Sequence, residues 1–426
     1  MKLIYVVIDG MGDLPVKELG NKTPLAVADT PNMSSLTKRG KSGLMYTVGK
    51  GYAPESDAGV VSILGYDPLK YNASRGVMEA VGSGMVFKEG DLALRCNFAT
   101  LGLGGKIIDR RAGRDLKKEE TVELSKEINT NVKLTSHPSS FNFKNTTGHR
   151  GVLVIRGRGI SLSGSITNTD PAYMRVGEIG VVNTNAKMVI QRCESMDDTK
   201  EARFAAELVN EFLEKSHSVL ENSIVNRKRS AAKKLIANGI LTRDAGHRLP
   251  SFFSINKRYN VRFCCLADMP LEIGIARLTG MNVVNLPHPS GDLAKDCEDR
   301  VKRLCSVLKS YDCFYIHIKG PDEPGHDGDC SLKKEMISTI DEHFFGSLLP
   351  RISLKEIIFC VTADHATPCK LKAHSDDPVP ILISGNKIQG DGGQDFSESS
   401  CEKGSLGLID HGYMIMPKLM AYLKQS

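Results

Sequence analysis

The sequence lacks a long apolar segment, since no run approaches the roughly 18 residues that a transmembrane helix needs. Its first apolar run is interrupted early by Asp9 and Gly10, and no small-residue cleavage site of a signal peptide follows. Aromatic residues make up only 6% of the chain, and the formal net charge of +6 is small for 426 residues. That charge does not indicate nucleic-acid binding without a local patch. We therefore expect a cytoplasmic protein with neither a membrane nor a nucleic-acid partner.

Cysteine is present without any regular spacing. The chain has 11 cysteines, an odd number, and no C-x-x-C pair. This usage predicts reduced, mostly buried thiols of an intracellular protein. The hydrophobic (41%) and charged (25%) fractions are those of a globular chain and exclude wholesale disorder. The length predicts two domains, or one large domain that carries an insertion.

Four apolar, β-branched segments predict buried strands of a parallel sheet. They are Leu3–Ile8, Cys313–Ile318, Ile357–Thr362 and Val379–Ile383. Acidic residues and histidines follow the first three of these strands within a few residues. In open α/β sheets, ligands bind beyond the carboxyl ends of the strands. A single aspartate there could simply cap the next helix, but three such strand ends together predict a binding site.

The middle of the chain has a different pattern. Between about residues 90 and 164, short alternating segments separated by Gly and Asn predict strands joined by turns. Residues 197–216 predict an amphipathic helix, and residues 230–238 continue in the same style. We therefore expect an α/β core formed by residues 1–80 and 262–426, with a mixed α+β domain inserted at residues 81–261.

Oxygen and nitrogen donors gather at the predicted strand ends. They are Asp9, Asp322, His326, Asp364, His365 and His374. Such a mixed set suits Mn²⁺, Zn²⁺ or Mg²⁺. Asp322 and His326 could chelate one ion from a loop or turn, whereas the adjacent Asp364 and His365 could serve two ions or hold one from different sides. A lone histidine is usually structural, but this concentration of donors favours a dinuclear site.

A candidate nucleophile, Ser56, precedes the helix-like segment 58–64. A serine at a helix N-cap or in the first turn lies beside unpaired backbone N–H groups, which favour an anion such as phosphate. An ordinary N-cap serine would show the same pattern. A neighbouring metal would distinguish the two cases, because it lowers the pKa of the hydroxyl and yields an alkoxide at neutral pH.

An ordered series of short motifs covers nearly the whole chain. It includes Ile8-Asp9-Gly10-Met11-Gly12-Asp13, Lys22-Thr23-Pro24-Leu25, Ser56-Asp57, Arg95-Cys96-Asn97, Asp109-Arg110-Arg111-Ala112-Gly113-Arg114, His317-Ile318-Lys319-Gly320-Pro321-Asp322, Thr362-Ala363-Asp364-His365 and His374-Ser375-Asp376. In this order the motifs resemble the alkaline phosphatase superfamily and, within it, the archaeal-type cofactor-independent phosphoglycerate mutases. The resemblance implies an alkaline-phosphatase-like core with an inserted substrate-binding domain. It also implies an isomerase of glycolysis and gluconeogenesis that interconverts 3-phosphoglycerate and 2-phosphoglycerate.

The same resemblance implies roles for individual residues. Ser56 would match the nucleophile that forms a phosphoserine intermediate. The first metal would be bound by Asp9, Ser56, Asp364 and His365, and the second by Asp322, His326 and His374. We expect two divalent ions, Mn²⁺ first, with Zn²⁺, Co²⁺ or Mg²⁺ as alternatives that the donor types leave open.

Cationic residues are candidates for holding the substrate, because arginine binds carboxylates and phosphates with two parallel donors. We expect these contacts from Arg111, Arg114, Arg150, Arg243 and Lys319. The family pattern has Arg-Gly-Ala-Gly where this chain has Arg243-Asp244-Ala245-Gly246. That departure leaves the details of glycerate binding open.

Two other functions are compatible with parts of the pattern. A metal-dependent phosphatase or phosphonate hydrolase would share the metal ligands, and water would then attack the phosphoserine. A second domain that excludes water and binds glycerate distinguishes a mutase from these enzymes. A non-catalytic basic protein is disfavoured, because all seven metal-site residues are present. The basic run 226–229 with Lys233 and Lys234 lacks interleaved aromatics and is expected to be a solvated helix face. The oligomeric state stays open.

Overall fold

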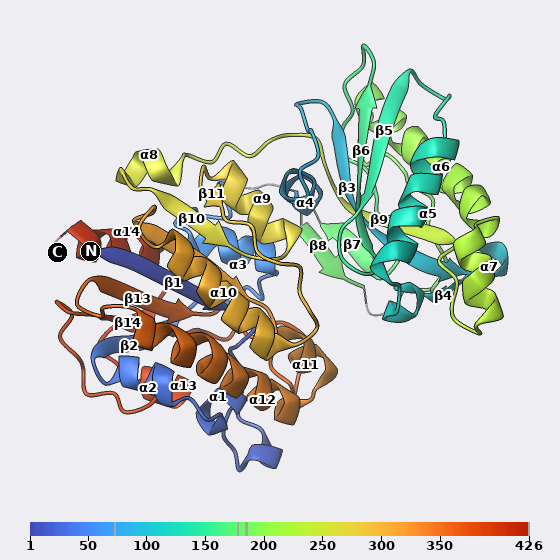
Figure 1. Cartoon of the computed structure of the whole chain (residues 1–426). Coiled ribbons are helices and arrows are strands. Elements are labelled where there is room, and N and C mark those ends of the chain that lie inside the picture. Colours follow the sequence, from blue (N-terminus) through green and yellow to red (C-terminus); the bar gives the residue numbers. More distant parts are fainter. Residues whose placement is uncertain (72–73, 177–178, 184–185, 425–426) are drawn as a thin grey trace. The chain divides into compact units, whose positions relative to one another are not determined.

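The computed structural model describes residues 1–71, 74–176, 179–183 and 186–424, and the chain forms two compact units (Figure 1). The core unit comprises Met1–Tyr71, Phe252–Asp268 and Ile275–Ser426. The inserted unit comprises Asn72–Ser251 and Met269–Gly274. The boundaries expected from the sequence, after residues 80 and 261, lie further along the chain than the observed ones, after residues 71 and 251.

An eight-stranded sheet forms the centre of the core unit. Its order is β11–β10–β12–β1–β13–β14–β2–β15. The strands are β1 (Lys2–Ile8), β2 (Gly40–Met45), β10 (Phe263–Leu266), β11 (Asn282–Val283), β12 (Cys313–Ile318), β13 (Ile357–Thr362), β14 (Val379–Gly385) and β15 (Gly407–Ile409). The five strands from β11 to β13 are parallel to one another. The predicted α/β fold with a mostly parallel sheet is therefore confirmed.

For one of the four predicted strands, the predicted direction is wrong. β14 was expected in a parallel sheet, but it is antiparallel to both β13 and β2. A parallel return needs a long crossover, usually a helix, whereas residues 363–378 between β13 and β14 contain no helix. The chain therefore turns at the carboxyl end of the sheet and runs back. Apolar composition reveals burial on both faces, but it carries no information on direction.

Helices pack against the core sheet. They are α1 (Pro24–Val27), α2 (Pro31–Thr37), α3 (Ser56–Ile63), α8 (Ile255–Tyr259), α10 (Leu293–Val307), α11 (Asp322–Asp327), α12 (Cys330–Ile340), α13 (Glu398–Cys401) and α14 (Ile415–Lys424), and α9 (Pro270–Leu278) begins in the inserted unit. Helices α10 and α12 lie side by side across one face of the sheet (Figure 1). Within the described part of the chain, no helix is long and apolar enough to cross a membrane.

The inserted unit contains an antiparallel sheet of five strands. Its order is β4–β3–β6–β5, with β9 paired to β3. The strands are β3 (Leu92–Leu101), β4 (Ile107–Asp109), β5 (Ser139–Asn145), β6 (Arg150–Gly157) and β9 (Gly239–Gly246), and β7 (Tyr173–Val176) pairs separately with β8 (Ile179–Val182). The strands predicted between about residues 90 and 164 are therefore confirmed by β3, β4, β5 and β6.

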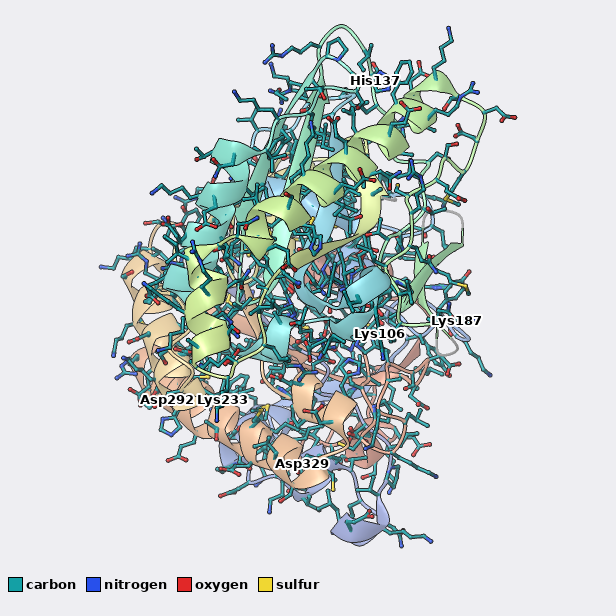
Figure 2. All side chains as sticks on the ribbon, turned by 90° about the vertical axis from the view of Figure 1, so that its right-hand side faces the viewer. Lys106, His137, Lys187, Lys233, Asp292 and Asp329 are labelled. Carbon is teal, nitrogen blue, oxygen red and sulfur yellow. The ribbon has the colours of Figure 1, made fainter. Side chains whose placement is uncertain are left out.

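One face of this sheet carries the apolar core of the inserted unit. Alternate residues of β3, among them Leu94, Cys96 and Phe98, pack against α5 (Lys118–Asn131) and α6 (Lys200–Glu221). Helix α6 corresponds to the helix predicted at residues 197–216, and Figure 2 shows it crossing the unit below the labelled His137. Because side chains alternate along a strand, the residues between these apolar ones face the other side of the sheet.

Helix α4 (Arg75–Gly82) lies in the inserted unit, although the sequence placed most of it in the core. Its N-cap, Ser74, donates a hydrogen bond to the backbone oxygen of Asp244. Gly82 lies so close to the start of α9 that an added Cβ would stand 1.7 Å from the backbone oxygen of Pro270. These backbone contacts join segments far apart in the chain, so a pattern read along the sequence does not reveal them.

The basic run also differs from its prediction. It forms helix α7 (Ile224–Ala231), and Arg229 on this helix is buried rather than solvated. Its guanidinium donates to the backbone oxygen of Leu235 at 2.8 Å and pairs with Glu120 at 3.0 Å and with Asp115. Lys233, labelled in Figure 2, is exposed as predicted, but it lies beyond the helix end and not on a helix face.

Candidate active site

Three loops of the core unit bring the predicted metal ligands together. Asp9 follows β1, Asp322 begins α11 after β12, and Asp364 with His365 follows β13. Strands β12, β1 and β13 are adjacent and parallel, so their carboxyl ends meet at one edge of the sheet. We call the following set the metal edge: Asp9, Ser56, Asp322, His326, Asp364, His365 and His374.

The first group of donors at the metal edge is Asp9, Asp364 and His365, all buried. His365 Nε2 lies 3.6 Å from Asp9 Oδ1 and 3.4 Å from Asp364 Oδ2. The hydroxyl oxygen of Ser56 lies 3.2 Å from the same nitrogen. Two ligand atoms that each lie about 2.1 Å from one shared ion are roughly 3.0–3.5 Å apart. The spacing of these atoms therefore suits a metal ion.

The charges in this group also favour the binding of a cation. Asp9 Oδ1 and Asp364 Oδ2 are buried and have no hydrogen-bond partner in the described part of the chain. Burial and the neighbouring Asp9 raise the pKa of Asp364 well above its usual range. Burial also disfavours the charged form of Asp9, but Lys319, 3.2 Å away, together with His317 and His365 outweighs burial and holds that pKa well below its usual range. Two buried carboxylates with unmet oxygens fit a bound divalent ion.

The histidine of the first group is in the form that a metal requires. Burial, with His374 stacked 3.8 Å away, lowers the pKa of His365 to about 3, so its imidazole is neutral. Its Nδ1 lies 3.0 Å from the hydroxyl of Thr367, which donates to Asp322 Oδ1 at 2.8 Å. This contact fixes the ring through the atom that faces away from the ligand group.

The second group of donors is Asp322, His326 and His374. The Nε2 atoms of the two histidines lie 3.1 Å apart, and they lie 3.5 and 3.3 Å from Asp322 Oδ1. Burial lowers the pKa of His374, but its contacts with Asp322 and Glu55 outweigh burial and raise that pKa to about 9. His374 Nδ1 lies 2.8 Å from the backbone oxygen of Pro54, which ties this group to the chain just before Ser56.

Ser56 is the first residue of α3, after the N-cap Glu55, as the prediction of an N-cap or first-turn position requires. The helix can approach the β13 loop because it carries glycine at position 59. A Cβ on Gly59 would lie 2.3 Å from the backbone oxygen of Asp364. The close packing of α3 on this loop therefore places the serine hydroxyl, at the positive end of the helix dipole, at the metal edge.

A second group of charged residues lies in the inserted unit, on the face of the sheet opposite its apolar core. In the antiparallel register Arg95 of β3 lies directly opposite Arg243 of β9. Glu79 of α4 lies 3.2 Å from Arg95 Nε and 2.9 Å from Arg75 Nε. We call the following set the arginine cluster: Arg75, Glu79, Arg95, Arg150, Arg243 and Asp244.

Positive charge is crowded in the arginine cluster. Burial, followed by the neighbouring Arg243 and Arg75, lowers the pKa of Arg95 to about 9. The Nε and Nη1 atoms of Arg243 and the Nε atom of Arg95 are buried without a hydrogen-bond partner among the described residues. Buried donors of this kind are nearly always satisfied in proteins. An anionic group with several oxygen acceptors, such as a carboxylate, would satisfy them.

The five residues predicted to bind substrate fall in three places. Arg150 and Arg243 belong to the arginine cluster, whereas Lys319 lies in the core unit beside Asp9. Arg111 and Arg114 lie in a turn whose residues 112, 113 and 114 have φ angles of 46°, 78° and 57°. Three successive left-handed residues are unusual and are a mark of functional turns.

The contacts of this turn are extensive. The carboxylate of Asp109 accepts the N–H groups of Arg111 at 2.7 Å and of Gly113 at 3.1 Å. The buried Arg229 donates to the backbone oxygen of Ala112 at 3.3 Å. The strained turn is therefore held on both sides.

Sequence reasoning missed Glu79 of the arginine cluster and three further polar residues of the site. Arg75 and Arg95 belong to the arginine cluster but were not predicted, although the alternation of β3 sets Arg95 apart from its apolar neighbours. The third is the buried His317 of β12, whose Nδ1 lies 2.8 Å from the hydroxyl of Tyr315 and whose Nε2 lies 3.7 Å from Asp9 Oδ1. A histidine inside an apolar strand was its only signal.

Comparisons with known proteins agree on one family. A family model described as 2,3-bisphosphoglycerate-independent phosphoglycerate mutase matches residues 37–226. A curated protein of that name from Aeropyrum pernix is 40% identical, over 99% of this chain and 100% of its own length. Another of that name, from Thermococcus kodakarensis, is 37% identical over 100% of this chain and 98% of its own length.

Solved structures of similar proteins share the fold over the whole chain. A protein from Pyrococcus horikoshii has a TM-score of 0.78 at 30% identity, covering 100% of this chain and 98% of its own. A cofactor-independent phosphoglycerate mutase from Thermoplasma acidophilum has a TM-score of 0.64 at 31% identity, covering 99% of this chain and 100% of its own.

Proposed function

The chain belongs to the 2,3-bisphosphoglycerate-independent phosphoglycerate mutase family, and we propose that it acts through a phosphoserine at Ser56 and a two-metal site at the metal edge. As a phosphoglycerate mutase, it interconverts 3-phosphoglycerate and 2-phosphoglycerate. We further propose that this reaction serves glycolysis and gluconeogenesis. The observation that carries the proposed mechanism is the hydroxyl oxygen of Ser56, which lies 3.2 Å from His365 Nε2 among buried carboxylates.

In the proposed mechanism, the oxygen of Ser56 attacks the phosphorus of 3-phosphoglycerate and the bond from phosphorus to the C3 oxygen breaks. The glycerate reorients, and its C2 oxygen then takes the phosphoryl group back from the serine. The positive end of the α3 dipole would stabilise negative charge that develops on the phosphoryl oxygens. Each half of the reaction balances, because the proton that leaves one hydroxyl is returned to the other.

The residues of the metal edge would hold two divalent ions, with Asp9, Ser56, Asp364 and His365 at the first and Asp322, His326 and His374 at the second. Bound divalent ions lower the pKa of the serine hydroxyl and neutralise phosphoryl charge. We expect Mn²⁺, with Zn²⁺, Co²⁺ or Mg²⁺ as alternatives, since mixed oxygen and nitrogen donors accept all of them. The buried, unpartnered oxygens of Asp9 and Asp364 support this assignment.

We assign the retention of glycerate to cations of the inserted unit. Arg150 and Arg243 of the arginine cluster would bind the glycerate carboxylate, and Arg75 and Arg95 would add to the positive potential there. Arg111, Arg114 and Lys319 are further candidates for contacts with the substrate. The unpartnered buried donors of Arg243 support the assignment. A mutase, unlike a hydrolase, needs such a holding site because the dephosphorylated intermediate must stay bound.

The test of the nucleophile is direct detection of phosphoserine. The full-length protein with Mn²⁺ is mixed with 3-phosphoglycerate, quenched in acid within milliseconds and analysed by peptide mass spectrometry. We expect phosphate on Ser56, and we expect Ser56→Ala to lose turnover by at least about 10³-fold while it keeps its fold.

Ser62→Ala is the matched control, because Ser62 lies on the same helix with a buried hydroxyl. It should retain mutase activity. Turnover by a well-folded Ser56→Ala protein would show that Ser56 is not the nucleophile. Inorganic phosphate as the main product of the wild-type protein would instead support a metal-dependent phosphatase.

A further inference from the structure

Strands β3 and β9 lose their regular register beside the arginine cluster. Ala93 pairs with Gly246 and Arg95 pairs with Arg243, so β9 takes three steps where β3 takes two. The extra residue forms a β-bulge. Within it Asp244 has a φ angle of +56°, in the left-handed region that favours glycine. A bulge of this kind changes the direction in which the neighbouring side chains point.

The bulge brings two successive side chains to the same place. In a regular strand Arg243 and Asp244 would point to opposite faces of the sheet. Here Asp244 Oδ2 lies 3.6 Å from Arg243 Nε and 3.8 Å from Arg95 Nη1. The backbone at this position is held on both sides, because Asp244 N–H donates to Asn168 Oδ1 at 3.2 Å and its backbone oxygen accepts from Ser74. The carboxylate is therefore kept beside two buried arginines.

The contacts of Asp244 differ from those of a carboxylate that orients an arginine. Asp170, in the same unit, binds Arg110 with two parallel hydrogen bonds of 2.9 and 2.5 Å. Asp244 lies near two guanidinium groups at distances too long for hydrogen bonds. The nearest nitrogen of Arg243, its Nε, has no hydrogen-bond partner among the described residues. Asp244 thus reduces the positive potential of the two arginines without using their donors.

We propose that Asp244 is a specificity determinant that weakens anion binding by the arginine cluster. Its fixed negative charge cancels part of the attraction that Arg95 and Arg243 exert on a ligand carboxylate. The incoming anion must also lie near this charge, which disfavours ligands with more negative charge than one carboxylate. The inference rests on the proposed function, because it takes the arginine cluster as the glycerate site. It adds that the affinity of this site is held below what its arginines alone would give.

The variant that isolates the charge is Asp244→Asn. Asparagine has nearly the same size and tolerates the left-handed conformation, so the bulge should persist. We expect the dissociation constant of 3-phosphoglycerate, measured by calorimetry with Mn²⁺ in a Ser56→Ala background, to fall about three- to tenfold. The KM of the single variant Asp244→Asn, which retains Ser56, should fall by a similar factor. Asp244→Gly, which suits the φ angle, should also bind more tightly.

The matched control is Asp198→Asn, which makes the same change in charge at an exposed position before α6. It should leave both constants unchanged. If Asp244→Asn binds 3-phosphoglycerate equally well or more weakly, Asp244 orients the arginines or is neutral, and the proposal is wrong. The calorimetric result needs no turnover. It therefore stands apart from the phosphoserine experiment, whose failure would concern Ser56 alone.

Discussion

In the core unit Asp9, Asp322 and Asp364 lie just beyond the ends of neighbouring parallel strands, whereas in the inserted unit Arg95, Arg150 and Arg243 project from the strands themselves. The metal edge gathers Asp9, Asp322 and Asp364 because three adjacent strands end together. The arginine cluster gathers Arg95 and Arg243 because an antiparallel register sets them side by side on one face of a sheet. Loops can adapt to the coordination of an ion, while a paired sheet holds broad cationic groups at fixed spacing.

Each of the two regions also contains buried charged groups with atoms that lack a hydrogen-bond partner, and these groups have opposite charges in the two regions. At the metal edge, buried carboxylate oxygens of Asp9 and Asp364 have no hydrogen-bond partner in the described structure. In the arginine cluster, buried guanidinium nitrogens of Arg95 and Arg243 likewise have no hydrogen-bond partner among the described residues. The first region therefore suits cations and the second suits an anion. Changes in the two regions should accordingly separate loss of chemistry from loss of substrate binding.

The largest effect is expected from Asp364→Asn at the metal edge. Loss of one proposed ligand should lower kcat by roughly three orders of magnitude or more. Burial and the neighbouring Asp9 raise the pKa of Asp364 and so disfavour its charged form, and asparagine has nearly the same shape without the charge. The metal-free variant should therefore unfold within about 1 kcal/mol of the metal-free wild type.

Activity assays and thermal melts with and without Mn²⁺ check this prediction together. The wild-type protein should lose activity with a chelator, regain it with Mn²⁺ and melt higher when loaded. The variant should regain little activity with Mn²⁺, and its melting temperature should rise less than that of the wild type, because only the second group of donors stays intact. If metal-free Asp364→Asn turned over substrate at the wild-type rate, the chemistry would not depend on the metal edge, and the contrast drawn between the two regions would be wrong.

An intermediate effect is expected from Arg243→Lys in the arginine cluster. Lysine keeps the charge but loses the paired donors, so KM should rise about 10- to 100-fold. Some glycerate should escape, and phosphorus NMR should then show more inorganic phosphate per 2-phosphoglycerate formed. Phosphoserine formation in the first turnover should continue.

Arg248→Lys provides the matched control, since Arg248 is exposed just after β9. It should behave as the wild type. If Arg243→Lys instead lost phosphoserine formation with KM unchanged, the arginine cluster would belong to the chemistry and not to substrate binding.

The smallest effect is expected from Arg229→Lys, outside both regions. The buried guanidinium of Arg229 supports the turn that carries Arg111 and Arg114, through Ala112 and Asp115. Lysine keeps the charge but makes fewer of these contacts. The variant should lose about 1–2 kcal/mol of unfolding free energy, measured by denaturant titration, and its KM should rise about threefold.

Arg227→Lys on the exposed side of the same helix should change neither quantity. A fall in stability without any change in KM would show that the turn does not take part in substrate binding.

Part of the metal edge could be predicted from the sequence, because several of its residues follow apolar strands directly. Asp9, Asp364 and His365 each lie within three residues of a strand end, so the general rule on parallel sheets was enough to gather them. Their roles came from the ordered motifs. The direction of β14 could not be predicted, since a buried strand has the same composition in either direction.

Much of the arginine cluster could not be predicted, because it depends on pairing between distant strands. Arg95 and Arg75 became part of the site only through the register of β3 with β9 and the packing of α4. The consequence of Asp244 needed the bulge, which no local pattern shows. Likewise, the burial of Arg229 could not be predicted, because its acidic partners lie about 110 residues earlier in the chain.

The central claim is that the phosphoryl group moves through Ser56 while the same glycerate stays bound. The most direct test adds excess ¹³C-labelled free glycerate to the wild-type protein with Mn²⁺ and unlabelled 3-phosphoglycerate. We expect unlabelled 2-phosphoglycerate and little inorganic phosphate, because the bound glycerate does not exchange with solution. Labelled 2-phosphoglycerate, or accumulation of inorganic phosphate in its place, would contradict it.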